Sequence, residues 1–126
     1  MATFRNFHTD NAPRALGPYS QAIESNGVLY FSGQIGIDPK TGDFPSNDIA
    51  SQAHQSCKNI KAIILAAGLT LKNVVKTTCF LANMDDFAIF NEVYGKYFAH
   101  KPARSCVAVK ELPKGALCEI EVIAVR

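Results

Sequence analysis

Residues 47–81 carry the clearest pattern in the chain: NDIASQAHQSCKNIKAIILAAGLTLKNVVKTTCFL. Asn47 or Asp48 can cap the start of a helix, and Gly68 supplies a left-handed stop. The run Val74–Leu81 that follows is apolar on both faces and rich in β-branched residues, which predicts a strand covered on both sides. The predicted helix has apolar residues at steps of three and four, namely Ile49, Ala53, Cys57, Ile60, Ile64 and Ala67.

Strands are expected on the N-terminal side of this helix. Residues 2–8 predict a short strand, and residues 20–25 and 28–32 predict a hairpin. Asn26-Gly27 lies between the last two runs, and both residues tolerate the positive φ that a tight hairpin turn requires. Asp38–Gly42 is then typical of a surface turn.

A second helix and two strands are expected on the C-terminal side. The helix covers residues 85–98, with Asp85 as its cap, and the strands cover about 104–109 and 117–125. A short turn with Pro113 and Gly115 joins these strands. The second helix carries an aromatic stripe formed by Phe87, Phe90, Tyr94 and Tyr97.

The predicted order is therefore β-β-β-α-β-α-β-β. This is an α+β fold, with one six-stranded mixed sheet and two helices in a single domain spanning residues 1–126. Two helices can cover only one face of such a sheet. We expect a second copy of the chain to cover the other face, in a closed homo-oligomer.

Composition limits the classes of function. The chain has 126 residues, of which 48% are hydrophobic and 19% charged, with a formal net charge of +2. These values fit a folded domain with its own core and argue against disorder. Lys and Arg form no run longer than two residues, so a nucleic-acid partner is not expected.

The cysteines and histidines do not predict a metal site, and no cofactor is expected. The spacings lack CxxC, HxxH and HExxH. Four thiols without an apolar leader in residues 1–9 favour a reducing, cytoplasmic location, although the Arg-bearing start leaves mitochondrial import open. No stretch reaches the roughly 20 apolar residues of a membrane span, so we expect no membrane association.

A candidate site lies on the last two strands. If these strands pair as a hairpin centred on residues 111–112, Arg104 falls opposite Glu119, with Cβ atoms about 5 Å apart. One interpretation is a structural ion pair. The other is a small-acid site, in which the planar fork of Arg104 holds a carboxylate while Glu119 orients water or moves protons. Spacing alone leaves both open.

Other candidate residues are less specific, and all of them except Asn91 have two interpretations. Tyr19 is an aromatic plug over the core or part of the site. The glycine in Ser32-Gly33 lets a ligand approach the backbone, or it serves a turn. Cys106 is a small packed side chain or a nucleophile, and Asn91 is a polar residue at the rim of the second helix.

Several short motifs occur in a fixed order along the chain. They are Gly17-Pro18-Tyr19-Ser20-Gln21-Ala22, Ser32-Gly33-Gln34-Ile35, Val74-Val75-Lys76-Thr77-Thr78, Pro102-Ala103-Arg104-Ser105-Cys106-Val107, Leu112-Pro113-Lys114 and Glu119-Ile120-Glu121. Each is weak alone. Together, over nearly the whole chain, they resemble the RidA family, also called YjgF/YER057c/UK114.

The resemblance implies a chorismate-mutase-like fold and a homotrimer with three clefts between subunits. It implies a hydrolase of the 2-iminobutanoate/2-iminopropanoate deaminase type, which converts reactive 2-enamino and 2-imino acids, such as 2-aminoacrylate, to 2-keto acids and ammonia without a cofactor. The family's carboxylate-binding arginine falls on Arg104 and its glutamate on Glu119. The implied catalytic residues are Arg104, Glu119 and Tyr19, and the implied substrate-binding residues are Arg104, Cys106, Ser32, Gly33 and Asn91.

The chain departs from the family before the Pro-Ala-Arg motif. Family members often carry an aromatic residue there, whereas this chain reads Ala99-His100-Lys101-Pro102 with one residue fewer, which bears on the cleft rim and on substrate size. Two other functions remain open: a translation-inhibiting endoribonuclease, and a non-catalytic, chaperone-like trimer that binds small carboxylates. Glu119 favours catalysis, because a pure anion sensor gains nothing from a nearby negative charge.

Overall fold

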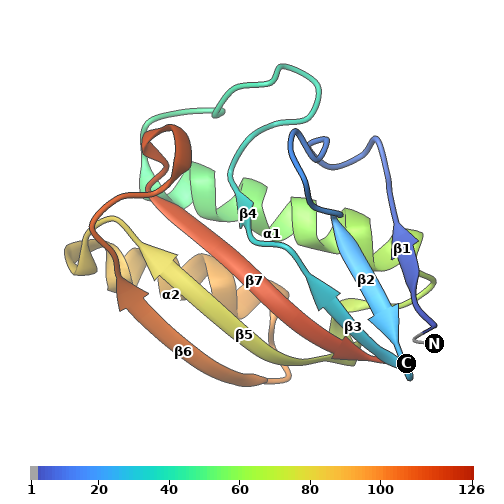
Figure 1. The fold of residues 1–126 in the computed structure, drawn as a ribbon. Coiled ribbons are helices and arrows are strands. Elements are labelled where there is room, and N and C mark those ends of the chain that lie inside the picture. The colour runs from blue at the N-terminus through green and yellow to red at the C-terminus, as the bar shows by residue number, and fades with distance from the viewer. Residues whose placement is uncertain (1–2) are drawn as a thin grey trace.

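Two helices pack on one face of a single mixed sheet in the computed structural model, which describes residues 3–126 (Figure 1). The seven-stranded sheet has the order β1-β2-β3-β7-β5-β6, and β4 pairs with β7. The strands are β1 Arg5–Phe7, β2 Ala22–Ser25, β3 Val28–Phe31, β4 Gln34–Ile35, β5 Val74–Leu81, β6 Ala103–Ala108 and β7 Cys118–Val125, and the helices are α1 Ile49–Ala66 and α2 Phe87–Tyr97. The predicted α+β class is confirmed, and the short β4 adds one strand to the six expected.

The N-terminal hairpin forms as predicted. β2 and β3 pair antiparallel, and the turn residues Asn26 and Gly27 have φ values of 52° and 78°. The strand expected at residues 2–8 is shorter, because only Arg5–Phe7 pairs with β2; residue 2 lies outside the described residues.

Helix α1 begins and ends where its caps predict. The Asp48 carboxylate accepts a hydrogen bond from the Ser51 backbone N–H at 2.8 Å, and Gly68 just beyond the helix has φ 79°. The inner face of α1 is fully buried, including Ile60 and Ile64. Each of these isoleucines contributes about 1.5–3 kcal/mol by leaving water.

Strand β5 is buried on one face only, so the expectation of cover on both sides is wrong for the single chain. Thr77, Cys79 and Leu81 are fully buried toward the helices. On the other face Val75 is 44% exposed. Both faces of this run are apolar, but the two helices lie on the same side of the sheet and cannot cover both.

The predicted hairpin of the last two strands is also wrong. β6 pairs parallel with β5, and β7 pairs antiparallel with the opposite edge of β5. Helix α2 supplies the crossover that parallel neighbours require. β5 therefore lies between β6 and β7, and β6 forms the outer edge of the sheet (Figure 1).

The start of α2 differs from the prediction. A 3-10 turn, Met84–Asp86, precedes the helix, and the Asn83 side chain caps that turn by accepting from the Asp85 backbone N–H at 2.8 Å. Asp85 is thus inside the turn rather than at the cap. Of the predicted aromatic stripe, Phe90 and Tyr94 are buried, and Phe87 and Tyr97 are partly exposed.

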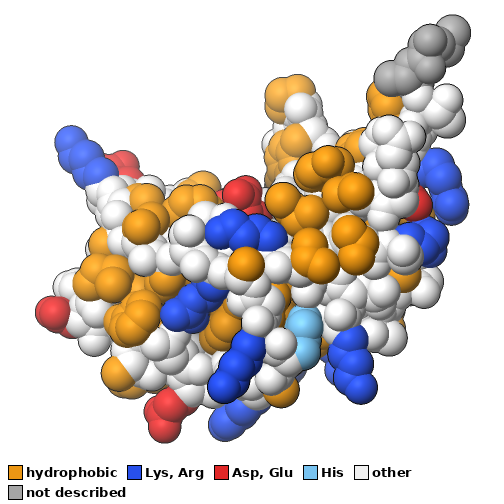
Figure 2. Space-filling view, turned by 90° about the horizontal axis from the view of Figure 1, so that it is seen from below, with side chains coloured by type: hydrophobic (Ala, Val, Ile, Leu, Met, Phe, Trp, Pro, Cys, Tyr) orange, Lys and Arg blue, Asp and Glu red, His pale blue; other side chains and the backbone are white. Residues whose placement is uncertain are grey.

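The sheet face away from the helices exposes large apolar side chains. Tyr30, Val107 and Val125 are 51%, 46% and 38% exposed, and each alternates with residues that point toward the helices. Figure 2 shows a different side of the molecule, turned by 90° from Figure 1, on which hydrophobic side chains gather in patches with Lys and Arg between them. Within residues 3–126, no helix has both the length and the apolar character needed to cross a membrane.

Candidate active site

Arg104 points toward the helices from the edge strand β6. In the β5–β6 register it pairs with Thr77, whose side chain also faces α2. The Arg104 Nη1 donates to Asn91 Oδ1 at 2.7 Å, so two of the predicted site residues are in direct contact. The ion pairs within residues 3–126 are His8–Asp10 and Arg126–Glu24, which leaves the half-buried Arg104 guanidinium without a carboxylate partner.

Two aromatic rings of α2 lie against the same guanidinium. The Arg104 Cζ is 4.9 Å from the Tyr94 ring centroid and 5.6 Å from the Phe87 ring centroid. Rings at these distances stabilise a cation without neutralising it. The remaining N–H groups of the fork therefore keep their capacity to bind an anion.

Cys106 shares the Arg104 side of β6. It is half-buried, and burial raises the pKa of its thiol, while the positive charge of Arg104 opposes that rise. A raised pKa favours the protonated thiol at neutral pH, which is a poor nucleophile. The environment of Cys106 thus suits a wall of the site better than covalent catalysis.

Glu119 faces the opposite side of the sheet, on β7. It pairs with Phe80 of β5 and Ile35 of β4, and a Cβ at Gly33 would collide with its carboxylate. Burial is the larger cause that raises the pKa of Glu119, and repulsion from Glu121 adds to it. Glycine at position 33 therefore makes room for a half-buried carboxylate.

Tyr19 and Ser32 lie near Gly33, the residue that adjoins the Glu119 carboxylate. Tyr19 and Gly33 line one open pocket of about 430 Å³ together with Leu16 and Pro113. The Ser32 hydroxyl donates to the Ser20 carbonyl at 2.6 Å and its backbone N–H donates to the Gln21 carbonyl, so the loop before β2 is tied to the end of β3.

The structure thus divides the predicted site into two groups. Arg104, Asn91 and Cys106 form a cationic half-site on the helix side of β6, and Tyr19, Ser32, Gly33 and Glu119 form an acidic half-site around β4 and β7. The expectation that Arg104 lies opposite Glu119 is wrong, because β5 separates their strands and Arg104 pairs with Thr77 instead.

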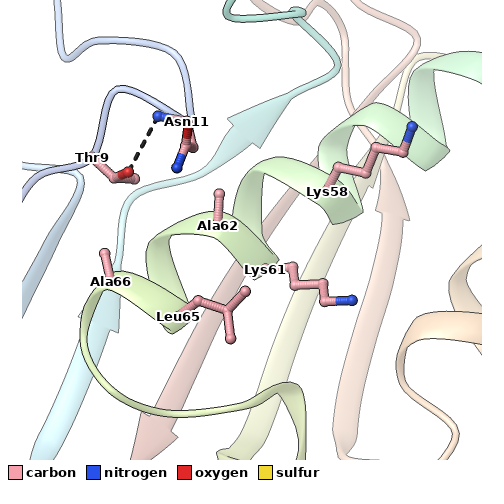
Figure 3. A pocket seen from close by; sticks show the side chains of 7 residues that line it. All are labelled: Thr9, Asn11, Lys58, Lys61, Ala62, Leu65 and Ala66. Atoms are coloured by element: carbon pink, nitrogen blue, oxygen red, sulfur yellow. Dashed lines mark hydrogen bonds between the residues drawn. The ribbon is translucent and has the colours of Figure 1, made fainter.

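A further pocket lies apart from both half-sites, between α1 and the loop at residues 9–11 (Figure 3). Its lining residues are Thr9, Asn11, Lys58, Lys61, Ala62, Leu65 and Ala66. It is an open groove, and five of its seven lining residues, including the two lysines, belong to α1. Among residues 3–126, no cluster of three or more His, Cys, Asp or Glu side chains is arranged to hold a metal ion.

Comparison with known proteins identifies the family of this chain. The model of the family described as endoribonuclease L-PSP matches residues 9–126. The chain belongs to this family, the YjgF/RidA family. The two half-sites are thus features of a YjgF/RidA chain, and the resemblance drawn from the short motifs is confirmed.

Relatives within the YjgF/RidA family cover nearly the whole chain. A RutC family protein of Pyrococcus horikoshii is 54% identical over 92% of this chain and 93% of its own. The 2-iminobutanoate/2-iminopropanoate deaminase of Escherichia coli K12 is 49% identical over 94% of each chain. The crystal structure of E. coli TdcF with bound serine has a TM-score of 0.92 and 44% identity, covering 97% of this chain and 98% of the other.

Three residues that contact or position Arg104 were not predicted for the site of this YjgF/RidA chain. The sequence pattern places Phe87 and Tyr94 in the core stripe of α2 and Thr77 in a buried strand. The signal was present in the spacing: Phe87, Asn91 and Tyr94 are separated by four and three residues, which places them on one face of α2. An amide between two aromatic residues on a buried face indicates a polar partner across the interface.

Proposed function

We propose that this chain hydrolyses 2-imino and 2-enamino acids to 2-keto acids and ammonia. The observation that carries the proposal is a half-buried guanidinium, Arg104, that has Asn91 and two rings as neighbours and no carboxylate partner among residues 3–126. Such a group is a receptor for a small carboxylate. The deaminase relative in E. coli and the TdcF structure with serine, which carries a carboxylate, agree with this chemistry.

Arg104 binds the substrate carboxylate through its free N–H edge, and a backbone N–H near Cys106 supports it. Two parallel charge-assisted hydrogen bonds hold the acid in one orientation. This turns the attack of water on C2 into an oriented step within a single complex. The raised pKa of the Cys106 thiol fits a neutral wall beside the anion.

Glu119 orients the attacking water and carries protons. Its raised pKa places the carboxyl closer to neutrality, where one group can both accept and donate a proton. Glu119 and Arg104 of one copy face opposite sides of the sheet, so we propose that the Glu119 side of one subunit meets the Arg104 side of a neighbour. A homotrimer with three such clefts also covers the exposed apolar sheet face.

The reaction balances without a cofactor. An enamine first moves a proton to C3 and becomes the imine. Water then adds to C2 of the imine and forms a carbinolamine, and a proton passes to its nitrogen through Glu119. Ammonia leaves, and the 2-keto acid remains on Arg104. Tyr19, which is half exposed at the cleft mouth, closes over the substrate or donates a hydrogen bond. The proposed role is the removal of reactive intermediates released by other enzymes.

A coupled assay tests this proposal. A threonine dehydratase generates the 2-aminocrotonate/2-iminobutanoate pair in solution, and the acceleration of 2-ketobutanoate and ammonia formation is measured. We expect wild-type protein to accelerate the release and Arg104→Ala to lose about 100-fold or more, since it removes two hydrogen bonds to a charged group. Equal rates with and without the wild-type protein would reject the deaminase function.

The endoribonuclease alternative is favoured by one observation, the description of the matched family. The cationic half-site contains a single arginine, which offers little to a polyanion. RNA binding through phosphates should weaken steeply with salt. A salt-dependent shift of RNA together with cleavage that Arg104→Ala abolishes would support the alternative over the deaminase. A third possibility, a carboxylate binder without turnover, predicts binding of 2-ketobutanoate but no ammonia release.

We also propose a cytoplasmic location. Cys57, Cys79, Cys106 and Cys118 are all free thiols in the structure. Free thiols persist in reducing compartments. Fractionation of cells that express the full chain tests this proposal.

A further inference from the structure

The contacts of Arg104 form a closed loop through the protein. Thr77 pairs with Arg104 along the β5–β6 register, the Arg104 guanidinium lies 4.9 Å from the Tyr94 ring centroid, and the Tyr94 hydroxyl shares a 2.7 Å hydrogen bond with Thr77 Oγ1. The loop thus returns to the residue from which it starts. It links the backbone position of Arg104 to the position of its side chain.

Tyr94 is the rigid member of this loop. Its side chain is 7% exposed, and Thr77 is fully buried. The Tyr94 ring is stacked with the ring of Phe90, at 5.8 Å, and with the ring of Phe98, at 4.7 Å between ring centroids. A ring that packs against two others and is bonded at its hydroxyl cannot turn without breaking several contacts.

We propose that Tyr94 is a positioning residue for Arg104, and that Thr77 holds Tyr94 in place. The choice of ligand in this inference rests on the proposed function. Asn91 accepts a hydrogen bond from Nη1 of Arg104, and the Tyr94 ring lies against the guanidinium. The remaining N–H groups of the guanidinium therefore point in one fixed direction. The ligand class is a short 2-keto or 2-imino acid that is bound through its carboxylate.

The first test separates the ring from the hydroxyl. Tyr94→Leu removes the ring under Arg104, and we expect KM for 2-iminobutanoate to rise about 3- to 30-fold, with kcat changed less than about 3-fold, because carboxylate binding is shared by ground and transition states. The matched control is Val93→Ala, which removes a buried side chain of the same helix that takes no part in the contacts of Arg104 and Tyr94 described above. An equal rise of KM in Val93→Ala would show that Tyr94 is merely structural.

The second test is a rescue. Thr77→Val leaves the buried Tyr94 hydroxyl without its partner, so we expect the ring to shift and KM to rise. The double variant Thr77→Val/Tyr94→Phe removes both polar groups, and we expect KM to return to within about 2-fold of wild type, since it leaves only the weak 4.0 Å contact of the Cys79 thiol unmade. A double variant as impaired as Thr77→Val would overturn the role of the hydrogen bond.

The third readout does not depend on catalysis. The Nε–Hε signal of Arg104 in a ¹H–¹⁵N spectrum, assigned from its loss in Arg104→Lys, reports the ring beside it. We expect the signal to keep its position in Val93→Ala, to move in Tyr94→Leu, and to shift on addition of 2-ketobutanoate to wild type. An unchanged signal in Tyr94→Leu overturns the inference. If wild type neither binds 2-ketobutanoate nor releases ammonia, the proposed function fails, while the spectrum of the free protein still decides the positioning role.

Discussion

Arg104 and Glu119 face opposite sides of one sheet and lie on strands that β5 separates. Arg104 pairs with Thr77 of β5, and Thr77 pairs on its other side with Val122 of β7. Val122 is buried toward the helices, and Glu119, three positions earlier, points the other way. The two residues that the proposed reaction needs thus lie on different surfaces of the chain, and we propose that a second copy brings them together.

The proposed role of Glu119 as a base predicts that activity depends on pH and on the neighbouring Glu121. Burial raises the pKa of Glu119 and repulsion from Glu121 raises it further, so activity that needs ionised Glu119 falls as pH drops through this raised value. Glu121→Gln removes the repulsion, and we expect the acidic limb of kcat/KM to move to lower pH. The control is Glu111→Gln in an exposed loop. If the acidic limb of the kcat/KM profile shifts no more in Glu121→Gln than in Glu111→Gln, the base role of Glu119 is contradicted.

Gly33 controls the position of the Glu119 carboxylate. A Cβ at position 33 would overlap Glu119 Oε2, which is the far end of a flexible side chain and can move away. We expect Gly33→Ala to lower kcat/KM by about 10- to 100-fold, because a shift of about 1 Å in a catalytic group has that cost. The midpoint of urea unfolding should change little. Full deaminase activity in Gly33→Ala would show that the position of Glu119 is unimportant.

Gly36 is required for packing between β4 and α1. A Cβ there would overlap the backbone carbonyl of Gln52, which cannot move without displacing the helix. We expect Gly36→Ala to lower the free energy of unfolding by about 1–3 kcal/mol, measured with urea. Gly95→Ala is the matched control: nothing lies within 4 Å of that Cβ, and an alanine inside α2 should stabilise by about 0.5–1 kcal/mol. Equal effects of the two substitutions would contradict this packing.

Asn91 keeps Arg104 oriented without neutralising it. Asn91→Asp has nearly the same shape but places a carboxylate where the amide oxygen now accepts from Arg104 Nη1 at 2.7 Å. The internal ion pair should compete with the substrate carboxylate, and we expect KM to rise about 10-fold or more, with a smaller rise in Asn91→Ala. Titration with 2-ketobutanoate measures the same loss of affinity. Unchanged affinity in Asn91→Asp would show that the anion binds elsewhere.

Local patterns predicted most elements of the fold. The periodicity of α1, its Asp48 cap and the Asn26-Gly27 turn depend on neighbours within a few residues, and the structure confirms them. The pairing of β6 was wrong because a short connection with Pro113 and Gly115 is typical of a hairpin turn. In the structure this connection carries the chain past β5, and α2 sets β6 parallel to β5. Strand neighbours are decided by tertiary packing, which spacing does not encode.

The sequence predicts individual residues of the candidate site but not which of them are in contact. Arg104 and Asn91 were both expected in the site, and their contact is visible only once α2 packs over β6. The sequence pattern places Tyr94 in the core, because an aromatic residue at helical spacing is typical of a core position. It belongs to the core and contacts Arg104 as well. One side chain can contribute both to core packing and to a functional site, and helical spacing in the sequence reveals only the packing.

A mixed-subunit experiment tests the central claim most directly. Arg104→Ala and Glu119→Gln chains carrying different tags are co-expressed, and oligomers that contain both chains are isolated. Each variant alone should be inactive. In a mixed ring of three, one cleft joins an intact Arg104 to an intact Glu119 from its neighbour, and the account predicts about one third of the wild-type deaminase rate. Mixed oligomers as inactive as the two parents would show that the two residues do not meet between subunits.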